Sequence, residues 1–370
     1  MLEDNAAELI KLLHAATAAG AYDPATGKWE GGGVPFPPWD AERAYAVGQG
    51  ASVGGKFWIA VEASTGQEPG VEAEAWVLVE TKAAVAAERN FIPITTHHPA
   101  QLVTDGTYLY LAKYAEPDIG RARLDGTGEY EDEWIDTAGI EPEGVAVSGT
   151  HIFWSGYSSA LKKSVIGRAL LDGSEPEPEW IVLGGEGTFA YGCALDGTTL
   201  YFAYEDAGEK QKWIGRVKTD GSELESEWVL TSEELSAGSS GGITVDGTHV
   251  YWATALKAHS QFGIGRVKLD GSEFEELWYE FPAGEGEDHG LDYFDGRIYF
   301  TRARSESDAD GVGRVVTDGS NPEPDWLPST HETRGGSRGI VFHGPFIYWA
   351  RSTLGEPEEA SIARAEWAVI

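Results

Sequence analysis

The chain has little of what would cross-link it or attract it to nucleic acid. Cys193 is the only cysteine among 370 residues, so an internal disulfide and a cysteine-based zinc site are excluded. Its surroundings, YGCALDG, are typical of a core strand, and we expect a buried, inert thiol there. The 27 basic residues are outnumbered by 61 acidic ones, which gives a net charge of −34. Because this charge repels phosphates, we expect neither nucleic acid nor anionic membranes as partners.

No stretch of the sequence is apolar for long enough to span a membrane, so membrane insertion is not expected. The first residues, MLEDNAAELI, are acidic where a secretory signal peptide carries positive charge. From the sequence we expect a protein that is made without a signal peptide and stays soluble in the cytoplasm. If it works outside a cell, lysis would release it.

What the sequence does contain is repetition. The phrase IGRARLDGTGEYEDEW begins at Ile119, and close variants begin at Ile166, Ile214, Ile264 and Val312. A second phrase, such as GITVDGTHVYWATA, joins an apolar run to an aromatic run through a glycine turn. It occurs six times, with its turn glycines 43 to 50 residues apart at Gly106, Gly149, Gly197, Gly247, Gly296 and Gly344. Repeats of this length with Asp-Gly hairpin turns predict one four-stranded blade each.

Six such repeats predict an all-β fold whose main part is a six-bladed β-propeller. The sixth repeat ends at SIARAEWAVI and is one strand short. We expect the segment NFIPITT, residues 90–96, to supply the missing outer strand, because a closed ring has no exposed sheet edge.

The two phrases resemble the YWTD propeller of the low-density lipoprotein receptor class B repeats. Blades of that family pair a Tyr-Trp strand with an Ile-x-Arg-x-x-Leu-Asp-Gly strand, and VYWATA and IYWARS are close to the first of these. The resemblance covers about residues 91–370 and implies the six-bladed fold. The Asp that ends the family signature is missing from all six copies, so no family ligand is implied.

Arginine and tryptophan recur at fixed places in the repeats. We interpret the arginines as groups between blades that pair with carboxylates, although a ring of anion-binding arginines is the alternative. We expect the tryptophans to pack the outer strands. The arginines are Arg121, Arg168, Arg216, Arg266, Arg314 and Arg364, and the tryptophans are Trp134, Trp180, Trp228, Trp278 and Trp326.

The variable segments of the repeats should share one face of the propeller. Strands alternate in direction, so the loop between the second and third strands and the connection between blades emerge together; we call this the loop face. Binding residues concentrate on variable loops of rigid scaffolds. Candidate ligand-binding residues there are Tyr114, Tyr157, Phe189, Tyr191, Tyr204, Trp213 and Phe262, with Arg302, Arg304, Arg334, Arg338 and Arg351 from the last two blades.

Aromatic and arginine side chains together suit an anionic or neutral glycan. The alternative is that the arginines neutralise the acidic stretches SESDAD and GEPEE. Catalysis has weaker support: histidines are present near this face at His97, His98, His289 and His331, without a hydrolase motif. We therefore predict no enzyme and no cofactor. Asp308 and Asp310 in SDADG offer oxygen ligands but lack the Glu that completes a calcium loop, so calcium is the weaker expectation.

Residues 36–80 contain none of the propeller phrases. Short β-type runs separated by Gly-Gly and Pro-Gly predict a small three-stranded domain. It resembles the chitin-binding-type carbohydrate-binding modules of families five and twelve, at Trp39, Tyr45, Gly48, Gly55, Lys56, Trp58, Gly66, Pro69 and Trp76. Gln49 and Trp58 depart from the Asp and Tyr of that family. The resemblance implies sugar contacts by Tyr45, Trp58 and Trp76; the alternative is that these rings form the domain core.

The remaining segments complete the predicted domain order. Residues 1–20 carry a short heptad seam, Leu2, Ala6, Leu9, Leu13 and Ala16, which predicts a helix for oligomerisation or docking. Linkers are expected over 21–35 and 81–90, with the propeller over 91–370.

This domain order resembles that of a bacteriophage tail protein. Such a protein would attach to other virion tail proteins through its N-terminus, form a homo-oligomer, and bind host cell-surface carbohydrate through the propeller loop face. We expect localisation in the virion tail after assembly in the host cytoplasm, and frequent Ala and Gly with few Lys indicate an actinobacterial host. The alternatives are a non-phage bacterial carbohydrate-binding propeller and a polysaccharide-degrading enzyme.

Overall fold

The computed structural model divides the chain into two compact units, one of Met1–Val85 with Glu366–Ile370 and one of Ala86–Ala365. Among the residues that the structure describes, there is no helix with the length and apolar character to cross a membrane. The helix predicted over 1–20 lies outside these residues. The structure describes residues 22–23, 28–29, 41–42, 44–45, 50–53, 56–60, 64–67, 76–79, 88–95, 99–206, 208, 211–232, 242–256, 261–282, 290–301, 311–327, 337–351 and 360–366.

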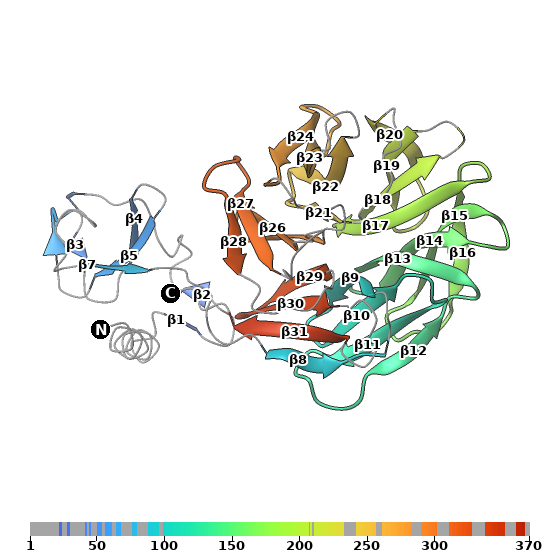
Figure 1. The fold of residues 1–370 in the computed structure, drawn as a ribbon, viewed down its shortest axis with the longest axis horizontal. Coiled ribbons are helices and arrows are strands. Elements are labelled where there is room, and N and C mark those ends of the chain that lie inside the picture. The colour runs from blue at the N-terminus through green and yellow to red at the C-terminus, as the bar shows by residue number, and fades with distance from the viewer. Residues whose placement is uncertain are drawn as a thin grey trace. The chain divides into compact units, whose positions relative to one another are not determined.

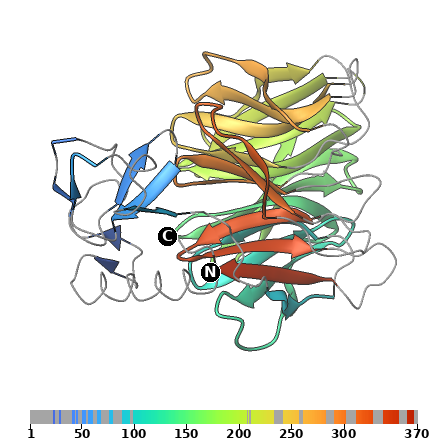
Figure 2. The ribbon, with the colours of Figure 1, turned by 60° about the vertical axis from the view of Figure 1, so that its left-hand side comes forward.

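The larger unit is the predicted six-bladed β-propeller, drawn in Figures 1 and 2. Each blade is a four-stranded antiparallel sheet, and the chain runs through the blades in sequence order. Blade 1 holds β9 (Pro99–Thr104), β10 (Tyr108–Lys113), β11 (Asp118–Arg123) and β12 (Glu131–Asp136). Blade 2 holds β13 (Ile140–Val147), β14 (His151–Ser158), β15 (Lys163–Leu170) and β16 (Glu177–Leu183). Blade 3 holds β17 (Thr188–Asp196), β18 (Thr199–Asp206), β19 (Gln211–Lys218) and β20 (Glu225–Ser232).

The second half of the ring repeats this plan. Blade 4 holds β21 (Ile243–Val245), β22 (His249–Leu256), β23 (Gln261–Lys268) and β24 (Glu275–Glu280). Blade 5 holds β25 (Leu291–Phe294), β26 (Arg297–Thr301), β27 (Val312–Val316) and β28 (Glu323–Leu327). Blade 6 holds β29 (Ser337–His343), β30 (Phe346–Arg351), β31 (Ser361–Glu366) and β8 (Glu88–Pro93). Buried apolar side chains form clusters between neighbouring blades. We call each such packed boundary between two blades a seam, and these seams make up the core.

The Asp-Gly-Ser turns between the third and fourth strands have a common hydrogen-bonding pattern. Asp172 accepts hydrogen bonds from the backbone N–H of Ser174 at 2.9 Å and from its hydroxyl at 2.6 Å. These bonds hold the pKa of Asp172 below its ordinary value. Gly173 has φ of 85°, a conformation that favours glycine, and a Cβ there would lie 3.1 Å from the Trp134 indole of blade 1. The turn glycine therefore lets the neighbouring tryptophan pack under it.

In every blade the guanidinium of an arginine on the third strand contacts a glutamate and an aromatic ring of the fourth strand, and we call this three-residue contact the clasp. Each repeat arginine pairs with a glutamate on the outer strand, with N–O distances between 2.5 and 2.8 Å. The guanidinium also lies over an aromatic ring of that strand, 3.7 to 4.9 Å from the ring centroid. In three blades it also donates to a carbonyl of the next blade, for example from Arg266 to Thr317 at 2.9 Å. The predicted pairing of these arginines with carboxylates is thus confirmed, but the pairs lie within each blade, and the contacts between blades are hydrogen bonds to backbone carbonyls.

The ring closes with a strand from before the first repeat. β8 pairs antiparallel with β31 as the outer strand of blade 6, which confirms the prediction that the segment around 90–96 closes the propeller. Glu88 pairs with Arg364 at 2.6 Å, and the Phe91 ring takes the position that tryptophan has in the other blades. Since Glu88 belongs to the clasp, the propeller begins inside the segment that was predicted as a linker.

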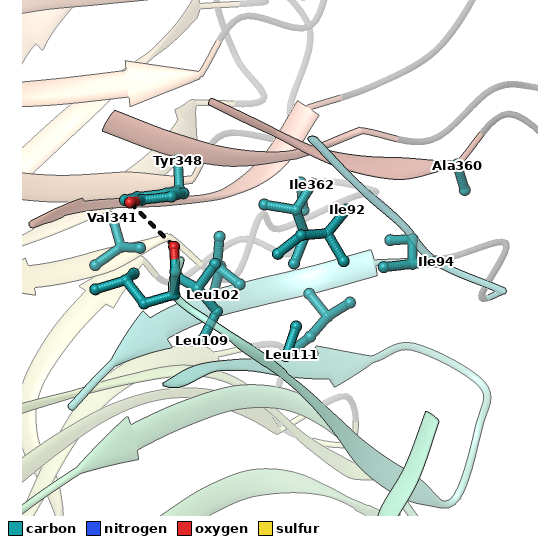
Figure 3. Close-up of a cluster of buried hydrophobic side chains, with 12 residues drawn as sticks. Ile92, Ile94, Leu102, Leu109, Leu111, Val341, Tyr348, Ala360 and Ile362 are labelled. Carbon is teal, nitrogen blue, oxygen red and sulfur yellow. Dashed lines mark hydrogen bonds between the residues drawn. The ribbon is translucent and has the colours of Figure 1, made fainter. Parts of the chain in front are cut away.

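Apolar packing completes the closure, as Figure 3 shows. Ile92 and Ile362 of blade 6 lie in one buried cluster with Leu109 and Leu111 of blade 1. The Tyr348 hydroxyl of blade 6 donates to a blade 1 carbonyl, that of Leu124, at 3.4 Å. The first and last blades therefore share a buried apolar core, as blades 1 and 2 and blades 2 and 3 do.

In the smaller unit the described residues form a three-stranded sheet, β4 (Gly50–Val53), β5 (Lys56–Ala60) and β7 (Trp76–Val79). The sequence predicted three strands at this place. Two further antiparallel pairs are present: β3 (Ala44–Tyr45) with β6 (Ser64–Thr65), and β1 (Tyr22–Asp23) with β2 (Lys28–Trp29). The last pair falls within the predicted linker over 21–35.

The first prediction concerns the clasp. Arg314 is 4 % exposed and Arg216 is 28 % exposed, so the same substitution should differ in effect. We expect Arg314→Met to lower the free energy of unfolding by about 3 kcal/mol, because it leaves Glu323 without its cation in a half-buried place. Arg216→Met should lower it by about 1 kcal/mol. Urea denaturation of both variants tests this, and equal losses would contradict it.

The second prediction concerns ring closure. Ile92 is 6 % exposed in the seam between blades 6 and 1, whereas Asn90 on the same strand is exposed. Ile92→Asp should lower the free energy of unfolding by more than about 3 kcal/mol, because it buries an unpaired carboxylate in the closing seam. Asn90→Asp should stay within about 0.5 kcal/mol of the parent. A small loss for Ile92→Asp would mean that β8 does not hold the ring.

Candidate functional site

The described part of the loop face belongs mainly to blades 1 to 3. It consists of the loops at 114–117 and 159–162 and the connections at 137–139 and 184–187. On this face the structure brings together two residues that the sequence predicted. The rings of Tyr157 at the end of β14 and Phe189 at the start of β17 stack with centroids 4.7 Å apart and planes 20° apart.

This stacked pair differs from the packing inside the blades. Tyr157 and Phe189 are each half-buried, and neither is a member of the apolar cluster between blades 1 and 2 or that between blades 2 and 3. The pair therefore presents aromatic surface at the rim of the seam between blades 2 and 3. This is the arrangement that sugar rings and cations use for stacking.

Other aromatic candidates contribute to the scaffold instead. Tyr204 is 3 % exposed and lies in the core cluster between blades 2 and 3, so it offers no surface to a ligand and its prediction is corrected. Trp213 and Phe262 are half-buried and pack against core clusters. Tyr114 is 41 % exposed in the loop after β10. Tyr191 is half-buried and follows Phe189 by two residues on β17.

The arginine candidates do not form a described patch. Arg351 is 6 % exposed at the end of β30 and has interaction partners, so it is a buried residue rather than a surface cation. Arg338 lies in β29 by its backbone. The remaining candidates lie outside the described residues: Arg302, Arg304 and Arg334, with Asp308, Asp310, His97, His98, His289 and His331.

In the smaller unit, Tyr45 is 1 % exposed and belongs to the core. This corrects its prediction as a sugar-stacking residue and agrees with the alternative of core packing. Trp58 lies opposite Leu78 in the pairing of β5 with β7, and Trp76 lies opposite Ala60. Sugar contact by these two tryptophans stays a prediction.

Hydrogen bonds of Gln101 to Val145 and Cys193 hold the inner strands of blades 1, 2 and 3 together. Cys193 is fully buried, which confirms the predicted burial, and this burial raises the pKa of its thiol to about 12. The Gln101 side chain of blade 1 accepts from the backbone N–H of Val145 in blade 2 and of Cys193 in blade 3, at 3.1 and 3.0 Å. It also donates to the Cys193 carbonyl at 2.9 Å. One amide thus joins three blades and is not free for a ligand.

A carboxylate cluster in blade 1 was not foreseen from the sequence. Glu116, Asp118 and Asp132 bring three carboxylate oxygens within 4.8 Å of one another, a grouping that could hold a metal ion. The ammonium of the fully buried Lys113 lies among them, bonded to Asp118, 2.8 Å from Asp132 and 3.2 Å from Glu116. Burial alone would lower the pKa of Lys113, but the bonds to Asp118 and Asp132 raise it. The lysine therefore supplies the cation.

This cluster supports the ring. Asp132 also receives a hydrogen bond from Thr95, just after the closing strand β8. The network thus ties blade 1 to the segment that completes blade 6. Its residues look like ordinary loop charges in the sequence, because the lysine and its three partners are spread over twenty residues.

A half-buried acid joins blades 5 and 6. Asp292 on β25 accepts a hydrogen bond from the backbone N–H of Phe342 on β29 at 2.9 Å. Burial raises the pKa of this carboxyl to about 7. In the same way Thr244 of blade 4 accepts from the backbone N–H of Tyr293 in blade 5 at 3.2 Å.

Comparison with known proteins gives the fold. Neither a protein-family model nor a curated protein matches the sequence. Among solved structures, the PQQ-bound aldose sugar dehydrogenase of Streptomyces coelicolor is 16% identical, with a TM-score of 0.55 over 76% of this chain and 97% of that chain. The calcium-binding protein regucalcin from Agrobacterium tumefaciens is 13% identical, with a TM-score of 0.51 over 76% and 94%.

A chain of a nidogen–laminin complex is also similar, at 16% identity and a TM-score of 0.48 over 70% of this chain and 97% of that chain. The sugar dehydrogenase is an enzyme, and regucalcin is described as binding calcium. At these identities the comparisons show a common propeller fold alone.

The third prediction concerns Lys113. Lys113→Met should lower the free energy of unfolding at pH 7.5 by about 3 to 5 kcal/mol, because three carboxylates lose their shared cation. Their mutual repulsion would raise their folded pKa values, so the stability deficit should shrink as the pH falls toward about 4.5. Denaturation at both pH values measures this. The exposed Lys162→Met is the control, and a deficit that does not change with pH would contradict the account.

The fourth prediction concerns Asp292. Its folded pKa of about 7 lies above the unfolded value, so its stabilising contribution is complete below about pH 4 and is lost as the pH rises through 7. Asp292→Asn keeps an acceptor for the Phe342 N–H and removes the titration. The variant should gain stability relative to the parent between pH 5 and pH 8, by at most about 4 kcal/mol. Parallel denaturation curves with no relative change would show that Asp292 does not titrate in this range.

Proposed function

We propose that this chain is a receptor-binding protein of a bacteriophage tail that binds host cell-envelope glycan through the propeller loop face. The observation that carries the proposal is that the side chains with a structural role differ from those that are available to a ligand. The residues that recur in every repeat make clasps, turns and seams, whereas Tyr157 and Phe189 stand half-buried at the loop face and pack on each other. Aromatic surface held on a rigid scaffold is suited to sugar recognition.

The phage context rests on the predicted domain order. A small module that resembles chitin-binding carbohydrate-binding modules precedes the propeller, and a short heptad seam precedes the module. We propose that residues 1–20 connect the protein to other virion tail proteins and to further copies of itself, so that several propellers face the cell. Several weak glycan sites on one particle would then act together through avidity.

The experiment is co-sedimentation of the full chain with whole cells and purified cell walls of several actinobacteria, with an assay for released sugar. Tyr157→Ala/Phe189→Ala should lose strain-selective binding. The matched control is Leu224→Ala/Phe274→Ala, which removes two side chains that are 44% and 43% exposed in the turns between third and fourth strands, away from the loop face. A four-arginine variant with Arg302, Arg304, Arg334 and Arg338 changed to Ala tests whether those side chains contribute.

Each outcome bears on the proposal. Selective binding that only the loop-face variants lose, without sugar release, is the expected result. Binding to no strain, or loss in the control variant alone, would contradict a loop-face receptor site and favour a structural role. Release of sugar would make the chain a polysaccharide-degrading enzyme.

A further inference from the structure

The stacked rings at the seam between blades 2 and 3 have carboxylates as their cross-strand neighbours. Glu141 on β13 lies directly opposite Tyr157 on β14, and Glu205 on β18 lies directly opposite Phe189 on β17. Side chains directly opposite each other in an antiparallel pair lie on the same side of the sheet, with Cβ atoms about 5 Å apart. The aromatic pair is therefore bracketed by two carboxylates, one from each blade.

β-Bulges produce this arrangement. The pairing of β13 with β14 shifts between Pro142 and Gly144, so that one extra residue of β13 is accommodated there. Residues on a strand alternate between the two sides of the sheet, and an extra residue reverses this alternation beyond the bulge. Glu141 rather than Pro142 thus shares a side with Tyr157. A bulge in β17 between Ala190 and Cys193 acts in the same way on Phe189.

The two inner strands also approach each other closely at this level. A Cβ on Gly144 would lie 2.6 Å from the Tyr191 carbonyl and 2.6 Å from the Cys193 backbone nitrogen. The Ser155 hydroxyl of blade 2 donates to that same Tyr191 carbonyl of blade 3. The backbones under the aromatic pair are therefore held together, which gives the four side chains above them a fixed base.

The two carboxylates differ in how far they are already neutralised. Glu205 has the ammonium of Lys212 at 4.0 Å. Glu141 is half-buried and has no ion pair among the residues that the structure describes. An anionic ligand would be repelled here, in a protein with a net charge of −34, whereas a cation would meet one unneutralised carboxylate beside two aromatic faces.

We propose that this seam, formed by Glu141, Tyr157, Phe189 and Glu205, binds a saccharide unit that carries a protonated primary amine. The inference rests on the proposed glycan-binding function and names the chemistry of its ligand. The ammonium hydrogen-bonds to the Glu141 carboxylate, and the sugar ring and its cationic substituent lie against the exposed aromatic surface. Acetylation of the amine removes the charge and should weaken binding. This assignment differs from the anionic or neutral glycan that the arginine candidates suggested.

The test is calorimetric titration of the full chain at about pH 6, where such an amine is largely protonated. The probes are a β-1,4-linked glucosamine tetramer, its fully N-acetylated counterpart and a galacturonate tetramer. The glucosamine tetramer should bind at least about tenfold more tightly than the acetylated one, and the galacturonate tetramer should not bind. Raising the salt to about 1 M should weaken glucosamine binding, because it screens the charge pair.

Variants assign the interaction to the seam. Glu141→Gln should weaken glucosamine binding about tenfold, and Tyr157→Ala/Phe189→Ala should abolish it. Glu205→Gln should have a smaller effect, because Lys212 already neutralises that carboxylate in part. Glu186→Gln, in the exposed connection before β17, is the matched control and should bind like the parent. Thermal unfolding of each variant shows that the fold is kept.

The contradicting results are distinct for the two proposals. Equal binding of the acetylated tetramer, preference for galacturonate, or an unchanged affinity in Glu141→Gln would overturn the amine assignment. Co-sedimentation of Glu141→Gln with cells separates this from the proposed function. If the parent and the variant both sediment with cells but neither binds glucosamine, the receptor function stands and the amine assignment fails; if neither binds cells or probes, both fail.

Discussion

The structure depends on one interaction repeated around the ring, a guanidinium held between a glutamate and an aromatic ring of the outer strand. It fixes the register of the third and fourth strands, and in three blades its remaining N–H group reaches a carbonyl of the next blade. A planar group with several donors and a stacking face can satisfy all these partners at once, which lysine cannot. In blade 6 the clasp is assembled from the two ends of the propeller sequence, Glu88 and Phe91 with Arg364, so the same contact that builds each blade also closes the ring.

Because the repeated residues make these contacts within the fold, few of their polar groups and aromatic faces are available to a ligand. The turns are rigid hydrogen-bonded units, the tryptophans lie against neighbouring turns, and the buried network around Lys113 reinforces the closing seam. What differs between blades is concentrated on the loop face. There, two bulged inner strands, a stacked aromatic pair and a carboxylate that has no ion pair within the described part of the chain occur together at one seam. Such a rigid base limits the ordering entropy that binding must overcome.

The fold could be predicted from the sequence because each blade repeats the same local signals, and even the closing strand NFIPITT was identifiable as an apolar segment next to an incomplete repeat. Individual site residues were less predictable. Tyr204 lies near the loop-face end of an aromatic strand, but the alternation of side chains along that strand directs it into the seam with blade 2. Glu141 and Glu205 are two of 61 acidic residues, and the bulges in β13 and β17, which the sequence does not mark, place them opposite Tyr157 and Phe189. Lys113 was missed because its partners are separated in sequence and meet through tertiary packing.

The most direct test of the account is hydrogen–deuterium exchange of the full chain with and without cell-wall fragments from a strain that it sediments with. The account predicts slower exchange in peptides that cover residues 155–163 and 184–191 at the seam between blades 2 and 3, with no change in the turns around 172–176 and 220–224. Protection confined to those turns, or to the strands of the smaller unit alone, would contradict the claim that the propeller recognises its ligand through the loop face.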